Sequence, residues 1–546
     1  MPPRSAPDDA RASRRGVLLL LACGLAILGL RLAAAFALGT PYLTDDSAGY
    51  LQHRPWQLDE VRTAAYPMLV WAALAVVSHP VGILLAHALG WAAAAWAAVA
   101  LVRRLTGSTA AALVALLLVG LTQKGWAFEL LLMSEHAQRC LFLAGWALAV
   151  LVLAEGGGAR ATAALGVVLL ANVLVKPSAV AALAALALVA AAAWRSPGLG
   201  ASRAAARRAI AALALAALGT AAYMGLFAAR HGAFDVTSFT GHNAIAHVGH
   251  MVDLDGPAHP EIKRELKAFL PRYQMDFAPD RLSDESWVAS MVQGAWFAFG
   301  STDERLRQAF GGASPSGVVR AAVAAAPGSY PGTSPHAKVD GVFKRLALEA
   351  VLARPIDYAR LAAYNLGKLL RVGLDAFYWW RDIGMPQSLP AHRADADRLA
   401  GDLDRMARAG ATVHAEALRN LVAEPPPVQV DAATADAFAL AASVVLLPMA
   451  LLAVPYVALE WIGIALAPCL LLLRGIAPPL RAALAVGWTT VAALLALMAL
   501  LNAAEPPRFL VPVQDMLALL GLLSTWTTGA RIAAWLRSRR APAERR

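Results

Sequence analysis

The sequence predicts an all-α polytopic membrane protein, and its composition and its apolar runs both support that fold class. Of its 546 residues, 59% are hydrophobic and only 16% are charged, and the mean hydropathy is +0.54. A soluble domain would carry about a quarter charged residues. Apolar runs of about 20 residues recur, and at about 1.5 Å per residue each can cross a hydrocarbon core of about 30 Å. A β-barrel would instead alternate apolar and polar residues.

Basic residues orient the chain in the membrane. They gather at Arg11, Arg14 and Arg15, at Arg103 and Arg104, between Arg195 and Arg208, and in the tail from Arg537 to Arg546. This is the positive-inside pattern, which places these segments in the cytoplasm. The net charge of +11 therefore does not indicate a nucleic-acid partner. The three cysteines lie within or at the edge of apolar runs, so we expect no disulfide framework.

The first apolar run, Gly16 to Leu38, has the basic flank of a signal sequence, but it is long enough to span. We expect it to remain as the first crossing, from cytoplasm to exterior. The short run from Tyr66 to Val77 is expected to lie on or dip into the outer surface. Further crossings are expected at Val81–Val102, Thr109–Leu121 with its flanks, Leu141–Ala154, Ala161–Val175, Ala179–Trp194 and Ala209–Ala228.

The character of the chain changes between Arg230 and about Val430, where charged residues, Pro and Gly appear. The parity of the crossings puts this insertion outside, and its short amphipathic runs predict a largely helical domain. Gly341 to Arg371 is expected to form two helices separated at Arg354–Pro355, because proline disfavours helical geometry at the preceding residue. Phe377 to Trp380 is typical of an interfacial aromatic belt.

Four apolar runs follow, at Ala437–Val457, Ile462–Leu473, Ala482–Leu501 and Phe509–Thr527. The basic tail argues for a cytoplasmic C-terminus and an even number of crossings. Seven crossings before the insertion and four after it make an odd number. Either one run is therefore re-entrant or lies on the surface, or the Tyr66 segment also crosses. We expect about 10–12 transmembrane helices in three parts: 1–230 with a first external loop at 39–66, 231–431 outside, and 432–546.

Polar residues at the outer ends of these runs are the candidates for chemistry. The loop "PYLTDDSAGYLQHR" carries Asp45 and Asp46. One of them could act as a general base at the outer face, and the alternative is a loop carboxylate that caps a helix. Arg62, Lys176 and Arg508 are also expected outside; each could bind an anion or simply extend to water at the end of a span. Glu135 could equally be a carboxylate at a helix start.

These segments together resemble the GT-C superfamily of integral membrane glycosyltransferases, of the bacterial type related to protein O-mannosyltransferases and lipid A aminoarabinose transferases. Asp46 to Tyr50 is similar to the family's D-x-x-x-Y motif, with Asp45 completing an acidic pair. The matches that follow are Arg62 to Pro67 for R-x-x-x-Y-P, Met133 to His136 for "LSEP" with His136 replacing proline, Lys176-Pro177 for a basic–Pro step, and Pro507 to Val513 for "PRYLLPV" with Phe509 replacing tyrosine. The resemblance does not cover Phe234 to Pro331.

This resemblance implies a GT-C-type bundle that transfers a sugar, with inversion, from a polyprenyl-phosphate donor. The acceptor would be a glycan, a lipid or a protein at the periplasmic face of the bacterial inner membrane. It makes Asp46 the expected catalytic base, with Asp45 as the alternative. Substrate-binding roles are expected for Tyr50, Arg62, Tyr66, Glu135, Lys176 and Arg508. A phosphate leaves readily, so no second carboxylic acid is needed, unlike in glycoside hydrolysis. No cofactor is expected, and a need for a divalent cation stays open.

Other assignments are weaker. The segment "GHNAIAHVGH" places His242, His247 and His250 in the external domain, but without cysteine or an H-E-x-x-H spacing they predict no metal site. A polymerase or ligase acting on polyprenyl-diphosphate-linked glycans is the first alternative function. A transporter or flippase of lipid-linked substrates is the second; it would need charges at mid-membrane depth or helices broken in matching halves. The spans instead read as Ala, Leu and Val with charges at their ends.

Overall fold

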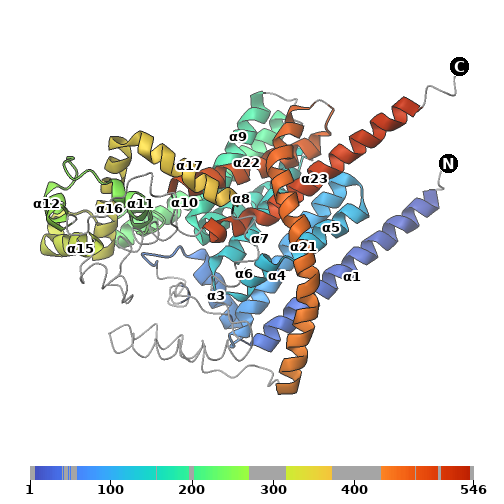
Figure 1. Ribbon diagram of the computed structural model, residues 1–546, viewed down its shortest axis with the longest axis horizontal. Coiled ribbons are helices and arrows are strands. Elements are labelled where there is room, and N and C mark those ends of the chain that lie inside the picture. The colour runs from blue at the N-terminus through green and yellow to red at the C-terminus, as the bar shows by residue number, and fades with distance from the viewer. Residues whose placement is uncertain are drawn as a thin grey trace.

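The protein is a helical bundle with a smaller helical domain beside one end (Figure 1). The computed structural model describes residues 6–39, 41, 47, 50, 58–154, 156–195, 202–269, 315–371, 432–473, 475–501 and 506–540. Every regular element within these residues is a helix. Eight of the described helices are long and apolar enough to cross a membrane. The prediction of an all-α, multi-pass membrane protein is confirmed.

The N-terminal part of the bundle follows the predicted apolar runs closely. Its elements are α1 (Ala6–Leu38), α3 (Ala65–Val76), α4 (Val81–Thr106), α5 (Thr109–Gly120), α6 (Gln123–Leu130), α7 (Ser134–Ala154), α8 (Ala159–Val175), the 3₁₀ turn η1 (Pro177–Ala179), α9 (Val180–Arg195) and α10 (Arg203–His231). Two of these helices start at a serine N-cap: Ser108 accepts from the amide of Ala111, and Ser202 from that of Ala205. Helix α7 begins at Ser134, seven residues before the apolar run expected at Leu141, because the polar first two turns are also helical.

The smaller domain, named the external domain here after its predicted side of the membrane, contains α11 (Thr240–Val248), η3 (Gly249–Met251), α12 (Pro260–Phe269), α15 (Pro315–Ala325), η6 (Pro327–Ser329), α16 (Pro335–Ala353) and α17 (Pro355–Arg371). It has its own core, which includes Ile245, Val319 and Phe343. The expected break at Arg354–Pro355 is confirmed. The helix before it begins earlier than the predicted Gly341, because Ser334 caps it and Pro335 occupies its first position. Phe377 to Trp380 lies outside the described residues.

The C-terminal part contains α21 (Ala432–Leu472), α22 (Pro478–Leu501) and α23 (Pro506–Arg540). The prediction of separate crossings at Ala437–Val457 and Ile462–Leu473 is wrong, since α21 runs through both. The stretch between them, Ala458 to Trp461, contains neither Gly nor Pro to end a helix, and Glu460 is buried, 5% exposed, instead of lying in a loop.

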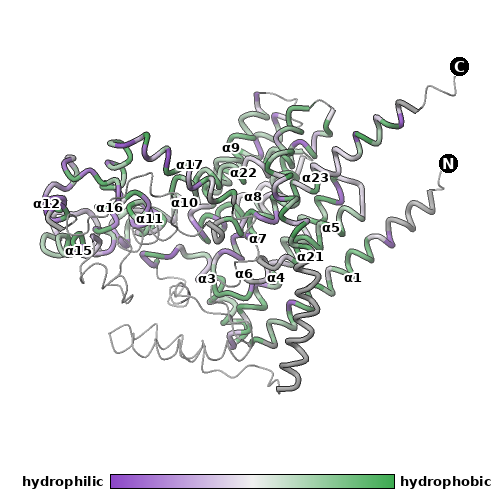
Figure 2. Tube along the Cα trace, viewed as in Figure 1, coloured by the Kyte–Doolittle hydropathy of each residue, from purple (hydrophilic) through white to green (hydrophobic). Residues whose placement is uncertain are grey.

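This merging removes one apolar run from the count of crossings. If the shorter helices α5 and α8 also cross and α3 does not, the described residues make ten crossings. An even number returns both termini to one side. Figure 1 agrees: the outer ends of α1 and α23 project together, on the side away from α11, α12 and α15. Figure 2 shows hydrophobic residues throughout the bundle and more hydrophilic residues around α12.

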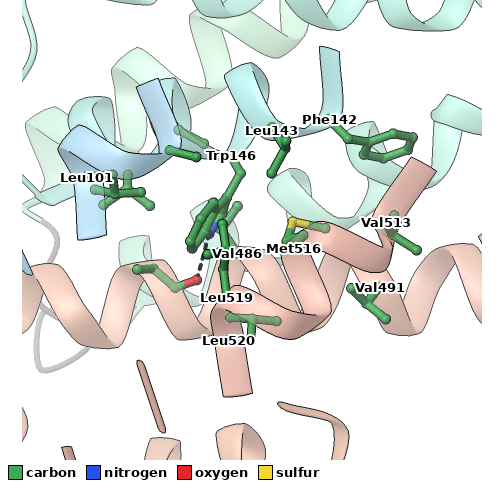
Figure 3. Packing of buried hydrophobic residues seen from close by; sticks show 14 of the residues in the cluster. Leu101, Phe142, Leu143, Trp146, Val486, Val491, Val513, Met516, Leu519 and Leu520 are labelled. Atoms are coloured by element: carbon green, nitrogen blue, oxygen red, sulfur yellow. Dashed lines mark hydrogen bonds between the residues drawn. The ribbon is translucent and has the colours of Figure 1, made fainter. Parts of the chain in front are cut away.

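The helices of the bundle approach closely in its core. Trp146 on α7 donates a hydrogen bond of 2.9 Å to the carbonyl of Ala483 on α22, and aliphatic residues such as Val486 and Leu520 surround it (Figure 3). Between α21 and α23, Gly463 and Gly521 each face the backbone of the other helix, where a Cβ would collide with a carbonyl oxygen. Small residues at such crossings give the close packing that replaces the hydrophobic effect inside a bilayer.

The expectation that charges stand only at the ends of the spans is wrong. Two ion pairs lie inside the bundle: Arg31 with Glu129, and Arg139 with Asp515. Each of these four residues is at most 3% exposed. The Arg31 guanidinium also stacks on Trp91, with Cζ 4.0 Å from the ring centroid. Each pair brings opposite charges together, so the bundle buries no net charge at these two places.

Candidate functional site

The candidate site lies where α7 begins and α8 ends. Lys176 donates a hydrogen bond of 2.7 Å from Nζ to Oε1 of Glu135. The Glu135 side chain is fully buried and that of Lys176 is 17% exposed. Pro177 ends α8 by holding Lys176 in an extended conformation (φ −156°, ψ 122°), so the ammonium stands at the helix end. Two residues that the sequence predicted separately are therefore in direct contact.

A directed chain of hydrogen bonds extends from this ion pair to the first external loop. Arg62 Nη1 donates to the hydroxyl of Tyr50 at 3.5 Å, and Tyr50 Oη lies 3.1 Å from Oγ of Ser134. Ser134 in turn donates to Oε2 of Glu135 at 3.5 Å. Because Arg62 can only donate and an ionised Glu135 can only accept, both hydroxyls between them donate their hydrogen bonds in the direction of Glu135. Among the described residues, this group brings together two cations, Arg62 and Lys176, and one carboxylate, Glu135.

The first external loop is fastened to the start of α7. Ser47 is fully buried, and its hydroxyl donates to the carbonyl of Leu132 at 3.1 Å. Tyr50, 4% exposed, makes the contact to Ser134 described above. Asp45 and Asp46, the predicted base and its alternative, lie outside the described residues. Asp46 directly precedes Ser47 in the chain.

Tyr66 packs against Tyr50 and supports the site. Its ring meets that of Tyr50 edge to face, with centroids 4.7 Å apart. His87 Nδ1 donates to the carbonyl of Glu129 at 2.7 Å, which leaves Nε2 to accept a hydrogen bond from the Tyr66 hydroxyl at 3.1 Å. Tyr66 is fully buried and His87 is 2% exposed. Tyr66 therefore acts as a support for Tyr50 in this structure, and the predicted contact with substrate stays a prediction.

Sequence reasoning missed several residues of this cluster. Ser134 stands next to the predicted Glu135, and a hydroxyl beside a carboxylate at a helix start was a usable signal. His87 is a single polar residue in an apolar run, which is a second such signal. Ser47, and Thr63, whose hydroxyl donates to the carbonyl of Val175 at 3.1 Å, carry no such signal in the sequence. Arg508, predicted at the outer mouth of the last span, falls in the first turn of α23, but its side chain lies outside the described residues.

The predicted histidines of the external domain lie in different surroundings, His242 and His247 on α11 and His250 in η3. His242 donates from Nδ1 to Oδ1 of Asp340 at 3.1 Å and stacks on His336, with ring centroids 4.5 Å apart. His247 lies 3.4 Å from Nδ2 of Asn365, which also donates to the carbonyl of Ala499 at 3.3 Å. The described His, Cys, Asp and Glu residues form no cluster of three suited to a metal ion.

Burial and charge shift several pKa values in this domain. Burial lowers the pKa of His247 to about 4, helped by the nearby His250. The pKa of His336 also falls to about 4, mainly through burial and then through His242. Burial alone would raise the pKa of Asp340, but the hydrogen bond from His242 and the charge of Lys344 outweigh it, so this pKa is lowered. At neutral pH, His247 and His336 are therefore neutral and Asp340 is ionised.

Comparisons with known proteins return two solved structures at low identity. No family model matches the chain, and no curated protein matches it. One structure is the apo state of ArnT from Cupriavidus metallidurans, 16% identical over 96% of this chain and 80% of that one, with a TM-score of 0.33. The other is the same protein bound to undecaprenyl phosphate, 15% identical over 95% of this chain and 79% of that one, also with a TM-score of 0.33.

Proposed function

We propose that the protein is a membrane glycosyltransferase of the GT-C type, which transfers a sugar from a polyprenyl-phosphate donor to an acceptor at the outer face of a bacterial inner membrane. The observation that carries the proposal is the cluster at the start of α7. There, Lys176 and Arg62 reach one buried carboxylate, Glu135, directly or through hydroxyls. The cluster belongs to the sequence motifs whose order resembles this superfamily.

Two cations at one site suit a phosphate. When the sugar–phosphate bond breaks, negative charge grows on the departing phosphate oxygen, and fixed cations in a site of low polarity stabilise that charge in the transition state. Lys176 would supply a point charge, and Arg62 a planar guanidinium able to hold two phosphate oxygens. Glu135 keeps Lys176 oriented through its 2.7 Å contact. The lipid tail of the donor would stay between the helices and the bilayer.

The acceptor hydroxyl needs a base, and Asp46 fits that role. Ser47 and Tyr50 are held next to Leu132 and Ser134, and Asp46 precedes Ser47 in the chain, which supports this assignment. In the proposed step, Asp46 takes the acceptor proton and the acceptor oxygen bonds to the anomeric carbon. The bond from that carbon to the phosphate oxygen breaks, and the electron pair leaves with polyprenyl phosphate. Attack opposite the phosphate inverts the anomeric configuration. Asp45 is the alternative base.

The proposal is tested by incubating the detergent-purified protein with a panel of radiolabelled polyprenyl-phosphate sugars. We expect release of polyprenyl phosphate by the wild type and a loss of about 10²–10³-fold in Lys176→Gln. Lys338→Gln is the matched control, since Lys338 is an external lysine that contacts the carbonyl of Pro327 at 2.6 Å. Turnover of diphosphate-linked glycans alone would contradict the proposal and favour the polymerase or ligase alternative. Equal turnover by wild type and Lys176→Gln would remove Lys176 from the site.

A further inference from the structure

Residues 58–63 form the last part of the first external loop before α3, and we call them the arm. The arm makes a dense set of contacts with the external domain. Three backbone carbonyls of the arm are involved. His231 Nε2 donates to the carbonyl of Leu58 at 2.8 Å. The amide of Ser238 donates to the carbonyl of Glu60 at 2.6 Å. Thr237 Oγ1 lies 3.0 Å from that carbonyl and 2.8 Å from the carbonyl of Val61, so its proton is shared between them.

The side chain of Glu60 is bound as well. Its Oε2 accepts a hydrogen bond of 2.7 Å from the hydroxyl of Ser334. Ser334 is the N-cap of α16, where its Oγ also accepts from the amide of Ala337 at 3.0 Å. A carboxylate at a helix N-terminus is further favoured by the helix dipole. The contacts reach the arm from the end of α10, from the connection to α11 and from the start of α16.

These three elements are themselves fixed together. Gly232 ends α10 with φ +71°, a conformation that suits glycine, and a Cβ there would meet the backbone of Thr333 at 3.0 Å. Thr333 in turn donates from its amide to the carbonyl of His231 at 3.0 Å. Thr237, Ser238 and His231 are at most 7% exposed, so water competes little for their bonds to the arm.

The arm continues directly into the candidate site. Asp59 Oδ1 accepts from the amides of Val61 and Arg62 at 2.6 and 2.8 Å, which bends the chain within the arm. Thr63 is then tied to the carbonyl of Val175, next to Lys176, at 3.1 Å. Arg62 therefore stands between one anchor on the external domain and one on the bundle. Its guanidinium lies over the ring of Tyr50, with Cζ 4.8 Å from the centroid.

We infer that the external domain sets the position of Arg62 in the donor site by clamping the arm, with Ser334 and Thr237 as positioning residues. The inference rests on the proposed function for the role of Arg62 at the donor phosphate, but the clamp itself is independent of any substrate. Arrangements of this kind matter because a misplacement of about 1 Å can cost about 10²-fold in rate.

The test uses two variants of the full-length protein in detergent. Ser334→Asp keeps a side chain that caps α16 but sets a second carboxylate against Glu60, so it separates capping from clamping. Thr237→Val removes the shared hydroxyl at nearly constant volume and serves if the first variant folds poorly. Ser334→Thr is the conservative variant, because it keeps the hydroxyl that caps α16 and donates to Glu60. The matched controls are Ser202→Asp, an N-cap at the far end of α10 bonded to the amide of Ala205, and Thr240→Val, an exposed threonine nearby.

Hydrogen exchange followed by mass spectrometry is the readout that needs no substrate. We expect both variants to speed exchange about tenfold in peptides that cover 58–63 and Ser238, while the controls and Ser334→Thr leave it unchanged. In the transfer assay, the KM for the donor should rise about tenfold, as the loss of one charged contact implies, and the KM for the acceptor should stay constant.

The outcomes separate the two claims. Unchanged exchange in both variants would overturn the clamp. Faster exchange with unaltered donor KM would overturn the positioning role while leaving the clamp. If the wild type turns over no polyprenyl-phosphate donor, the proposed function fails, and the exchange data by themselves still decide whether the external domain holds the arm.

Discussion

The buried pair between Arg139 and Asp515 ties the two halves of the bundle together, and its removal gives a sharp stability test. Arg139 on α7 donates from Nε to Oδ2 of Asp515 on α23 at 2.5 Å, and the hydroxyl of Tyr456 on α21 donates to Oδ1 at 2.8 Å. Both charged side chains are 2% exposed. Asp515→Asn would leave the guanidinium buried without its counter-charge. We expect a loss of about 3–5 kcal/mol in the free energy of unfolding.

A second variant tests whether the protein loses stability only when one partner of the pair is removed. In the triple variant Arg139→Met, Asp515→Leu, Tyr456→Phe, all polar partners leave together, and such replacements by apolar residues of similar volume are often neutral. We therefore expect the triple variant to be more stable than Asp515→Asn alone. Asp255→Asn is the control, because Asp255 pairs with Lys267 on the surface with both side chains more than half exposed, and it should change nothing measurable.

Unfolding in mixed micelles with increasing SDS, followed by circular dichroism, measures these differences. Asp515→Asn within about 1 kcal/mol of the wild type would refute the reasoning, since the penalty for an isolated buried charge is several times larger. A triple variant less stable than Asp515→Asn would refute it in another way, by showing that the pair contributes net stability beyond mutual neutralisation.

Three further predictions concern the site and the external domain. Arg62→Lys should raise the donor KM about tenfold in the transfer assay, because lysine keeps the charge but loses the planar group that stacks on Tyr50; an unchanged KM would contradict this. Tyr66→Phe should lower the unfolding free energy by about 1 kcal/mol, since His87 loses its donor; a gain in stability in the SDS titration would contradict it. Burial lowers the pKa of His247 to about 4, below its usual 6.5, so the unfolded chain binds more protons between these values. Stability should hold above pH 6.5 and fall by up to about 1.4 kcal/mol per unit as the pH drops toward 4; scanning fluorimetry should show this fall reduced in His247→Gln.

Most of the fold could be predicted from sequence because the length of an apolar run is a local property. The run expected at Val81–Val102 became α4, Val81–Thr106, and the break at Arg354–Pro355 appeared where proline requires it. The continuous helix α21 could not be predicted in this way. Glu460 interrupts the apolar pattern, and only packing in the folded bundle makes its burial tolerable.

The candidate site could likewise be predicted only in the part that local sequence determines. Glu135 and Lys176 stood out individually as charges at the ends of apolar runs, but they are 41 positions apart, and only the packing of α7 beside α8 brings them to 2.7 Å. Ser47 and His87 matter through contacts to backbone carbonyls far along the chain, at Leu132 and Glu129. Such contacts leave no pattern in the neighbouring sequence. The buried ion pairs were missed for the same reason.

The measurement that tests the central claim most directly is the rate of sugar transfer by Asp46→Asn beside the wild type, with the polyprenyl-phosphate donor that the panel identifies. We expect the variant to lose about 10²–10⁴-fold in rate while it still binds polyprenyl phosphate, because asparagine keeps the shape of the side chain but cannot take the acceptor proton. Loss in Asp45→Asn instead would move the base to the neighbouring residue. Full activity in both variants would contradict the account of this loop as the source of the catalytic base.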